Sequence, residues 1–351
     1  MPSASIIIVT YNGRHYLDGC LASVQRELGP GDELIVVDNA SADGTAEFLQ
    51  ARFPWVTLIR NAENRGFAPA CNQGAALAGG DVLVFLNQDT RVEPRWLSAL
   101  AAGLEGRDGA GLVTSQLLLL SRPGRVQMCG QDVHFSGLVF GRGFGLPAGT
   151  LDTPGPVAAV CGASFAIRRE LWQALGGFDE TLYMYYEETD LSWRARLRGH
   201  RSGYAPGSVV YHDYLPAQPN PTRFYYTARN RYLLIGKNWR LRTLFLLLPG
   251  LALAEAVDWF LALAMGGQGL RAKARANLWL LRHPGRIRAQ RAAAQAGRTA
   301  GDAAILAERV HRLTPLETEL GPAGRAAVAV CNALFQINHR LALALCRRFG
   351  W

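Results

Sequence analysis

The chain has 351 residues, of which 49% are hydrophobic, a composition ordinary for a folded protein. Its charge is uneven, because residues 1–220 contain 17 Arg, no Lys and 22 acids, whereas residues 221–351 contain 20 Lys or Arg and 6 acids. Six scattered cysteines without a CxxC pair argue against a disulfide scaffold and predict buried thiols in a reducing compartment. The start of the chain has no basic segment followed by a cleavage site, so we expect no secretion signal.

Strand and helix patterns alternate through the first ninety residues. Short apolar runs, the first of them β-branched, are typical of strands covered on both faces, and the segments between them have the apolar spacing of helices. This alternation predicts an α/β fold with a mainly parallel central sheet and helices on both faces. The predicted strands are 5–10, 33–38, 56–59 and 81–86, and the predicted helices are 15–27, a segment beginning at Ala46, and 69–79.

The pattern is less regular after this region. Residues 108–160 are rich in Gly and Pro and contain strand candidates at 110–120 and 132–140. An ordered block follows from Val157 to His212. We therefore expect a first domain over 1–220, with its first half (1–110) and second half (111–220) having different roles.

Residues 221–351 are predicted to form a basic, amphipathic helical extension. The apolar segment 243–265 is close to the roughly 20 residues that span a membrane. Glu255 and Asp258 would be costly inside a bilayer, and Pro249-Gly250 is expected to break the helix. The pattern favours helices that lie in the membrane interface, and a true span is the alternative.

Basic residues with interleaved Trp and Leu follow this apolar segment. Such a segment suits an anionic membrane surface, and nucleic acid is the competing partner. We expect no nucleic acid, because the neighbouring apolar helices would serve no purpose on it. The basic residues are Arg271, Lys273, Arg275, Arg282, Arg286, Arg288, Arg291 and Arg298.

Polar residues at the predicted strand ends are candidates for binding, because ligands of such sheets bind at the carboxyl ends of the strands. Asp38 can accept hydrogen bonds from a base or a ribose, or it can simply cap a helix. Arg65, in a Gly-containing link before a helix, can meet a phosphate or carboxylate, or belong to a plain strand–helix link. Asp89 can hold Mg²⁺ or Mn²⁺, or be a solvated turn residue. His212 becomes a second ligand only if the fold brings it to Asp89.

Three acids stand close together at Glu187, Glu188 and Asp190, among aromatic residues. Apolar surroundings and mutual repulsion raise the pKa of a carboxylate, which suits a general base. The alternative is a helix N-terminus, where acids complement the dipole. Asp190 and Arg194 have the spacing of a structural i,i+4 pair, so we expect the base at Glu187 or Glu188.

The order and spacing of these motifs resemble glycosyltransferase family two, an inverting family with the GT-A fold. The resemblance covers roughly residues 4–240 and is nearest to bacterial rhamnosyltransferases. The motifs are Ile8–Asn12, Val36–Thr45, Asn64–Phe67 with Asn72 and Gly74, Asn87-Gln88-Asp89, Gly162-Ala163, Arg168-Arg169, Gly176–Glu180, Glu187–Leu191 with Arg194, His212, and Arg229–Arg231.

The resemblance implies a role for each matching position. Glu188 stands where the family usually has a catalytic Asp, which leaves open whether Glu187 or Glu188 is the base. Asn87 replaces the first Asp of the family's metal motif and removes a charge. The implied catalytic residues are Glu188, Glu187 and Asp190; the donor-binding residues are Thr10, Tyr11, Asn12, Asp38, Asn64, Arg65, Gly66, Asn72, Asn87 and Gln88; the acceptor side is Gly162, Ala163 and Ser164; and the metal ligands are Asp89 and His212.

The implied activity is transfer of a sugar, with rhamnose as a first guess, from a dTDP-, UDP- or GDP-linked donor to a saccharide or lipid-linked saccharide acceptor. Residues 1–110 would bind the nucleotide sugar and residues 111–220 would supply the acceptor side and the base, with Mg²⁺ or Mn²⁺ as cofactor. The tail would hold the enzyme at the cytoplasmic face of the cell membrane. A nucleotidyltransferase on the same scaffold and a non-catalytic membrane-associated scaffold of a polysaccharide assembly complex are the alternatives.

Overall fold

The computed structural model describes residues 2–106, 110–214, 220–314 and 320–351. Its contacts divide the chain into two compact units. Two short segments from the N-terminal part of the sequence belong with the C-terminal helices, so the units are not continuous in sequence. The first unit comprises residues 1–131, 141–195 and 200–216, and the second comprises residues 132–140, 196–199 and 217–351.

The first unit is built on a ten-stranded mixed sheet. Its strands are β1 (Ala4–Thr10), β2 (Glu33–Asp38), β3 (Thr57–Arg60), β4 (Val82–Asn87), β5 (Thr90–Val92), β6 (Ala110–Leu119), β7 (Arg122–Met128), β10 (Gly155–Val157), β11 (Ser164–Arg168) and β12 (Arg201–His212). The order is β10-β12-β6-β11-β4-β1-β2-β3, with β5 beside β12 and β7 beside β6. β1 pairs in parallel with β2 and β4, and β2 with β3, because a helix returns the chain to the same end after each strand. β11 runs antiparallel between β4 and β6.

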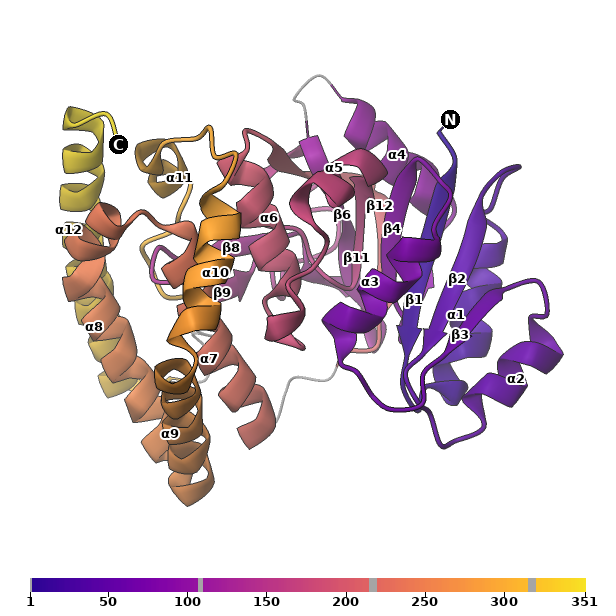
Figure 1. Cartoon of the computed structure of the whole chain (residues 1–351), viewed down its shortest axis with the longest axis horizontal. Coiled ribbons are helices and arrows are strands. Elements are labelled where there is room, and N and C mark those ends of the chain that lie inside the picture. The colour runs from indigo at the N-terminus through magenta and orange to yellow at the C-terminus, as the bar shows by residue number, and fades with distance from the viewer. Residues whose placement is uncertain (1, 107–109, 215–219, 315–319) are drawn as a thin grey trace. The chain divides into compact units, whose positions relative to one another are not determined.

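Helices cover both faces of this sheet (Figure 1). They are α1 (Arg14–Gln25), α2 (Thr45–Arg52), α3 (Phe67–Leu77), α4 (Trp96–Glu105), α5 (Arg169–Leu175), the 3₁₀ turn η1 (Glu180–Leu182) and α6 (Glu187–Leu197). Ile6 and Ile8 pack in one core with α1, α2 and α4, whereas Ile7 packs in the other with α3, α5 and α6. Successive strand residues point to opposite faces, which is why the run is apolar throughout. The predicted α/β fold with a parallel central part is confirmed.

One predicted strand is wrong. Segment 132–140 forms two short paired strands, β8 (Gln131–Val133) and β9 (Val139–Gly141), rather than one. Between them Gly137 adopts a φ of 85°, and the amide of His134 donates to the carbonyl of Leu138. A left-handed glycine of this kind closes a tight turn that a continuous strand cannot contain.

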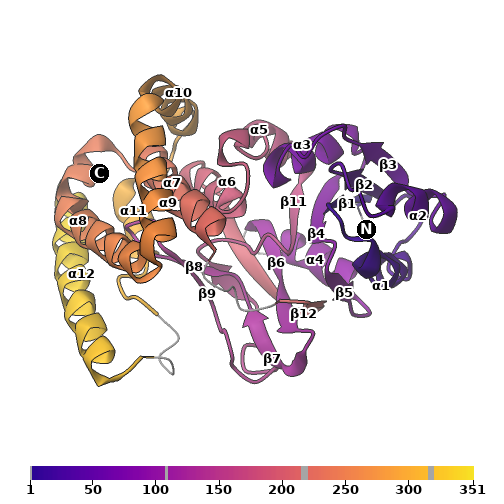
Figure 2. The same cartoon turned by 90° about the horizontal axis from the view of Figure 1, so that it is seen from below.

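The second unit is helical, and Figures 1 and 2 both show two of its long helices, α8 and α12, side by side. Its helices are α7 (Pro221–Asn238), α8 (Leu241–Ala264), α9 (Gly266–Arg282), α10 (Pro284–Gln295), α11 (Asp302–Ala307) and α12 (Pro322–Arg348). Among the described residues, α8 and α12 are the two helices long and apolar enough to cross a membrane.

Only one stripe of α8 is buried. Its buried residues recur every three or four positions, which is the period of a single helix face. They are Thr243, Leu247, Gly250, Ala254, Asp258 and Ala262. The rest of the helix carries exposed apolar side chains, among them Phe245 (72% exposed) and Phe260 (69% exposed). A large exposed apolar surface of this kind marks a contact with a membrane or another protein.

The predicted break at Pro249-Gly250 does not occur, and α8 continues through it. Proline cannot donate a backbone hydrogen bond and pushes the preceding turn apart. The side chain of Asn338, on α12, satisfies the opened turn: its amide nitrogen donates to the carbonyl of Leu246 at 2.9 Å, and its oxygen accepts from the amide of Gly250 at 3.1 Å. A side chain from another helix thus bridges Gly250 and Leu246, the rung next to the one that the proline cannot form.

The two acids of α8 are also accommodated within the unit. Arg231 of α7 lies 3.1 Å from Glu255 and 2.8 Å from Asp258, and Lys273 of α9 lies 2.7 Å and 3.2 Å from the same carboxylates. The Arg231 and Lys273 side chains are almost fully buried. Two cations therefore balance two anions between α7, α8 and α9, where Asp258 is buried and the Glu255 side chain is 27% exposed.

Candidate active site

The turn after β1 is held by a side chain from the end of β4. The side-chain oxygen Oε1 of Gln88 accepts from the hydroxyl of Thr10 at 2.6 Å and from the amide of Tyr11 at 3.0 Å. Gly13 permits this approach, since a Cβ there would lie 2.0 Å from Gln88 Oε1. Thr10 is fully buried, whereas the ring of Tyr11 is 47% exposed at the carboxyl edge of the sheet. Thr10 and Gln88 position this edge, and Tyr11 is the member of the group that a ligand can reach.

The loop after β2 is organised by Asn39, which our sequence reading did not select. Its amide nitrogen donates to Asn64 Oδ1 and to the carbonyl of Gly66, and its oxygen accepts from the amide of Arg65. The buried Asp38 accepts from the backbone amide two residues beyond Asn39 in the same loop. Asn64 therefore fixes the loop, while the Arg65 side chain is exposed and forms no ion pair within the described chain.

Asn12 and Asn72 also hold backbone. The side chain of Asn12 accepts from the amide of Ala42, joining the loops after β1 and β2. Asn72 on α3 donates to the carbonyl of Phe178 and accepts from its amide. Its predicted influence on a donor pocket would thus be exerted through the segment that precedes α6.

Asp89 and His212 are brought together by the pairing of β5 with β12. Nε2 of His212 lies 3.2 Å from Oδ1 of Asp89, and Nδ1 of His212 lies 2.8 Å from Oε1 of Gln127. With Nδ1–H donating to Gln127, the Nε2 lone pair of a neutral imidazole faces the carboxylate. Oδ1 of Asp89 is buried and accepts no hydrogen bond from the described residues, although Nε2 of His212 is near.

This pair fits two positions of a divalent cation. Adjacent ligands of an octahedral ion, each about 2.1 Å from it, lie about 3 Å apart, close to the distance between Nε2 and Oδ1. The buried oxygen without a donor is the kind of atom that a cation satisfies. Within residues 2–106, 110–214, 220–314 and 320–351, no group of three or more His, Cys, Asp or Glu side chains is placed to hold a metal. A cation here would therefore need further ligands from substrate or water.

The second acid cluster opens α6. Oε1 of Glu188 accepts from the side-chain amide of Gln131 at 2.7 Å, and Gln131 also accepts from Thr189. Gly162 faces this carboxyl group, since a Cβ at that position would lie 3.3 Å from its carbon. Glu187 is 6% exposed, and its Oε2 has no hydrogen-bond partner among the described residues.

The two glutamates differ in their environment. Burial, and then the charge of Glu188, raise the pKa of Glu187 well above its ordinary value. Burial also raises the pKa of Glu188, but hydrogen bonds from α6 backbone amides, from Gln131 and from Gly162 favour its charged form. Glu188 is therefore the better carboxylate of the pair, and Glu187 the better holder of a proton.

The segment before α6 is strained. Tyr183, Tyr185 and Tyr186 have φ angles of 65°, 65° and 76°, which bulky residues rarely adopt. Gly66 lies against it, because a Cβ there would approach the ring of Tyr183 to 2.5 Å. Strain of this kind persists where surrounding contacts over-determine the backbone, commonly at functional sites.

Two predicted site residues are placed elsewhere. Asp190 is fully buried and forms the expected pair with Arg194 at 2.7 Å, so it has no free access to an acceptor hydroxyl. Ser164 is also fully buried, and its hydroxyl accepts from Trp96 and bonds to Ser115 in the core. Strand alternation turns Ser164 inward, so its assignment to the acceptor side is wrong.

A chain of contacts connects the two acid clusters. Gly162 lies beside Glu188, and the next residue, Ala163, accepts through its carbonyl from the amide of Asn87 at 3.0 Å. Asn87 ends β4 and precedes Asp89 by two residues. Both clusters therefore border the carboxyl end of β4.

The sequence analysis did not select four residues around these clusters, namely Gln127, Gln131, Asp213 and Tyr16. Gln127 and Gln131 lie in the irregular region, where no local pattern marks them. Asp213 directly follows His212 and could have been suspected from its position. Burial and the charges of Asp213 and Asp89 raise the pKa of Tyr16, which shows that the start of α1 faces this group.

The mixed sheet, its helical layers and the acids at the end of β4 define a GT-A type domain. The family model described as Glycosyl transferase family 2 matches residues 5–174. Residues 5–174 of this chain therefore form a domain of the glycosyl transferase family 2 type.

Two curated relatives show the range of the similarity. The uncharacterized protein y4gI of Sinorhizobium fredii is 31% identical over 228 residues, which cover 60% of this chain but only 24% of the relative. The N-acetylglucosaminyl-diphospho-decaprenol L-rhamnosyltransferase of Mycobacterium tuberculosis is 28% identical over 236 residues, which cover 59% of this chain and 75% of the relative. This chain thus spans about a quarter of the first relative and three quarters of the second.

A solved structure of GalNAc-T7 with UDP, GalNAc and Mn²⁺ has a similar fold. Its TM-score is 0.57 at 20% sequence identity, over 69% of this chain and 49% of that chain. At this identity the likeness supports the GT-A fold and nothing finer.

Proposed function

We propose that the chain is an inverting glycosyltransferase that moves a sugar from a nucleoside-diphosphate donor to a hydroxyl group of a saccharide acceptor. The observation that carries this proposal is the position of two different acid clusters at the carboxyl end of β4. One is a carboxylate–imidazole pair suited to a cation, and the other contains a carboxylate suited to a general base. A single displacement of a nucleoside diphosphate requires both functions.

Glu188 is the proposed base. Its carboxylate takes the proton of the acceptor hydroxyl while the oxygen attacks the anomeric carbon, and the bond to the diphosphate breaks on the opposite face. The hydrogen bond from Gln131 fixes the carboxyl group, and Gly162 leaves room beside it. A raised pKa brings such a base closer to the operating pH.

Asp89 and His212 are the proposed ligands of Mg²⁺ or Mn²⁺, and a structure with a similar fold, that of GalNAc-T7, was solved with Mn²⁺. When bound, the ion neutralises charge on the leaving diphosphate. On the nucleotide side, the exposed Tyr11 and Arg65 are the proposed contacts for the base and the phosphates. Asp38, Asn64 and Asn72 would act mainly by holding the loops in place.

The proposed donor is a dTDP-, UDP- or GDP-sugar, with rhamnose the first candidate sugar because a relative is named as a rhamnosyltransferase. The same name supports a lipid-linked diphosphate saccharide as acceptor. The exposed apolar faces of α8 and α12 and the basic charge of the second unit support association with the inner face of the cell membrane.

A donor assay tests the function. Purified protein is incubated with each nucleotide sugar, with and without Mn²⁺, and release of nucleoside diphosphate is measured. We expect slow, metal-dependent release with one nucleotide class, and its loss in Asp89→Ala. Asp18→Ala, an exposed acid on α1, is the control that should retain release.

Absence of release with every donor, in the presence of membranes and acceptor lipid, would favour a non-catalytic scaffold. Release that is unchanged in Asp89→Ala would remove the metal role from Asp89. Membrane association is tested separately by co-sedimentation of Phe245→Asp/Phe260→Asp with vesicles. Leu77→Asp, which changes an exposed apolar residue of the first unit, is the matched control.

A further inference from the structure

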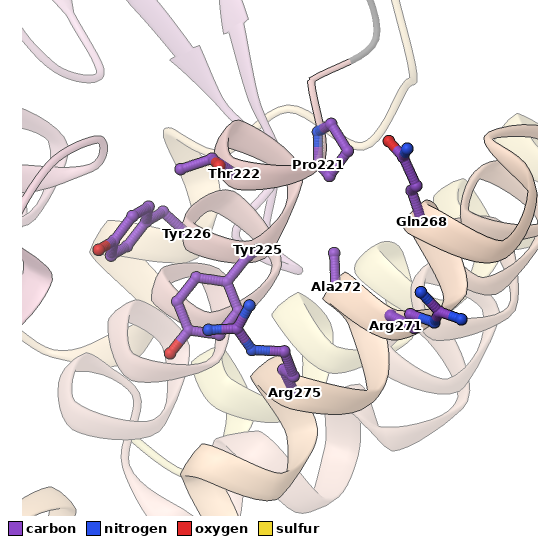
Figure 3. A pocket seen from close by; sticks show the side chains of 8 residues that line it. All are labelled: Pro221, Thr222, Tyr225, Tyr226, Gln268, Arg271, Ala272 and Arg275. Carbon is purple, nitrogen blue, oxygen red and sulfur yellow. The ribbon is translucent and has the colours of Figure 1, made fainter.

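The second unit contains a hollow of about 270 Å³ between α7 and α9 (Figure 3). Its wall on α7 includes Pro221, Thr222 and two adjacent tyrosines, and its wall on α9 includes Gln268, Ala272 and two arginines. On each helix the lining residues recur at intervals of three or four, so one continuous face of each helix meets the hollow. The lining residues are Pro221, Thr222, Tyr225, Tyr226, Gln268, Arg271, Ala272 and Arg275.

The charged groups that line this hollow are two arginines, which donate hydrogen bonds and carry positive charge. Arg271 and Arg275 lie one helical turn apart and are exposed, and neither forms an ion pair within the described chain. This contrasts with Lys273 between them, which points to the other side of α9 and is paired with Glu255 and Asp258. No acidic side chain is among the described lining residues. Like charges at this spacing destabilise a helix unless an anion joins them.

The tyrosines hold the hollow in shape. The guanidinium of Arg275 lies 5.2 Å from the ring centroid of Tyr225, and Figure 3 shows the two side chains side by side. The buried Arg229 lies 5.5 Å from the ring of Tyr225, 5.0 Å from that of Tyr226 and 4.8 Å from that of Trp279. A third guanidinium thus adds positive potential beneath the tyrosines.

The first turn of α9 also opens here, since Gln268 is its third residue and its N-cap has no side-chain hydrogen bond. The start of α7 is different, because Asn220 caps the amides of Thr222 and Arg223. Helix N-termini favour anions, which adds to the two arginines but does not replace them. Planar guanidinium groups match the oxygens of phosphate better than any other side chain.

We infer that this hollow is a binding site for the diphosphate group of a membrane lipid. Two guanidiniums one turn apart match the two phosphoryl groups of a diphosphate, and the same unit exposes the apolar faces of α8 and α12 that a lipid surface would cover. The inference deepens the proposed function, on which it rests, because it gives a lipid-linked diphosphate acceptor a place on the chain. The site is separate from the residues proposed for catalysis.

The test uses the full chain and phosphatidylcholine vesicles that carry either polyprenyl diphosphate or phosphatidylglycerol at equal charge. We expect unmodified protein to bind the polyprenyl diphosphate vesicles at least tenfold more tightly, and Arg271→Gln/Arg275→Gln to lose that preference. Arg286→Gln/Arg288→Gln removes two exposed arginines of α10 and is the matched control, which should retain it. Gln268→Trp, which fills the mouth and keeps every charge, should also lose the preference.

Equal losses in the pocket and control variants would show that diffuse charge binds the membrane and would overturn the inference. So would equal binding of the two vesicles by the unmodified protein. Inorganic diphosphate, added as competitor, distinguishes the source: binding as tight as that of the lipid would overturn the lipid part of the inference. Release of nucleoside diphosphate from the donor should be unchanged in all variants, which checks their folding. Lack of release in the unmodified protein would contradict the proposed function and leave the vesicle result to decide the pocket.

Discussion

Each unit of this chain contains a pair of neighbouring acids, one buried and one partly buried, and the two pairs have different partners. In the second unit Glu255 and Asp258 are both paired with Arg231 and Lys273. In the first unit Glu187 and Glu188 form no ion pair with any described residue, and Oε2 of Glu187 has no hydrogen-bond partner there. The acid pair of the second unit is neutralised by its cations, whereas the acid pair of the first unit is not.

The difference indicates that one acid pair serves the packing of helices and the other serves a reaction. Buried charges that are balanced by cations specify how helices pack, and their pairing restricts reaction with anything else. Buried carboxylates without a cation are costly to fold, which makes a function the reasonable explanation for their retention. The following substitutions test this contrast, beginning with the largest expected effect.

Glu188→Gln should reduce sugar transfer by about 10²–10⁴-fold, because a general base contributes roughly that factor. Donor binding, measured by the thermal shift with nucleotide sugar, should remain. In the unmodified protein, transfer should fall as the pH is lowered through the raised pKa of Glu188, because the base must be ionised. Full activity in Glu188→Gln would exclude it as the base.

Lys273→Met should destabilise the second unit by about 3–5 kcal/mol, because removing one partner of a buried ion network leaves uncompensated charge. The measurement is the loss of helical circular dichroism on heating. Arg282→Met removes a charge from the exposed end of the same helix and should change the free energy of unfolding by less than about 0.5 kcal/mol. Adding Asp258→Asn to Lys273→Met should recover part of the loss; no recovery would mean that lost packing is responsible.

Asn338→Leu should cost about 1–3 kcal/mol, since it leaves a partly buried carbonyl and a buried amide of α8 without partners. The same substitution in a Pro249→Ala background is the control. Pro249→Ala removes the ring that pushes the turn apart, so the amide of Gly250 can bond to the carbonyl of Leu246 directly. Asn338→Leu should therefore cost less in that background, and the difference measures the coupling. Equal costs in both backgrounds would show that Asn338 does not compensate for the proline.

Glu187→Gln should have the smallest effect, and it should raise the stability of the protein rather than lower it. Because its pKa is raised in the folded protein, Glu187 holds its proton to a higher pH there than in the unfolded chain. The stability that it contributes is present below the unfolded pKa and is lost as the pH rises through the folded pKa. The variant should therefore melt at a higher temperature than the unmodified protein on the alkaline side and keep its transfer activity. Loss of transfer would move the base to Glu187.

Local patterns in the sequence were sufficient for the central sheet. The β-branched run at Ile6–Val9 and the acids that end two apolar runs placed the first, second and fourth strands within one residue of their observed limits. The pairing of Asp190 with Arg194 also followed from spacing alone. These features depend on neighbours within one strand or one helical turn.

The errors concern partners that are distant in sequence. Asn338 lies 88 residues after Gly250, so no local pattern could show that the helix continues through Pro249. The sequence also could not show that Arg231 and Lys273 face the acids of α8, which had argued against a membrane span. Gln131 contacts Glu188 from 57 residues away, and Ser164 faces inward because of a sheet position that the sequence did not define.

The long separation between Pro249 and Asn338 also introduces a delay during synthesis of the chain. At about 5–20 residues per second, a ribosome needs roughly 4–18 seconds to add the 88 residues that separate Gly250 from Asn338. Throughout that interval the opened turn of α8 has no side chain to close it. A helix that is synthesised later therefore completes an earlier one, and a message truncated before α12 would yield a protein that is defective far upstream of the missing residues.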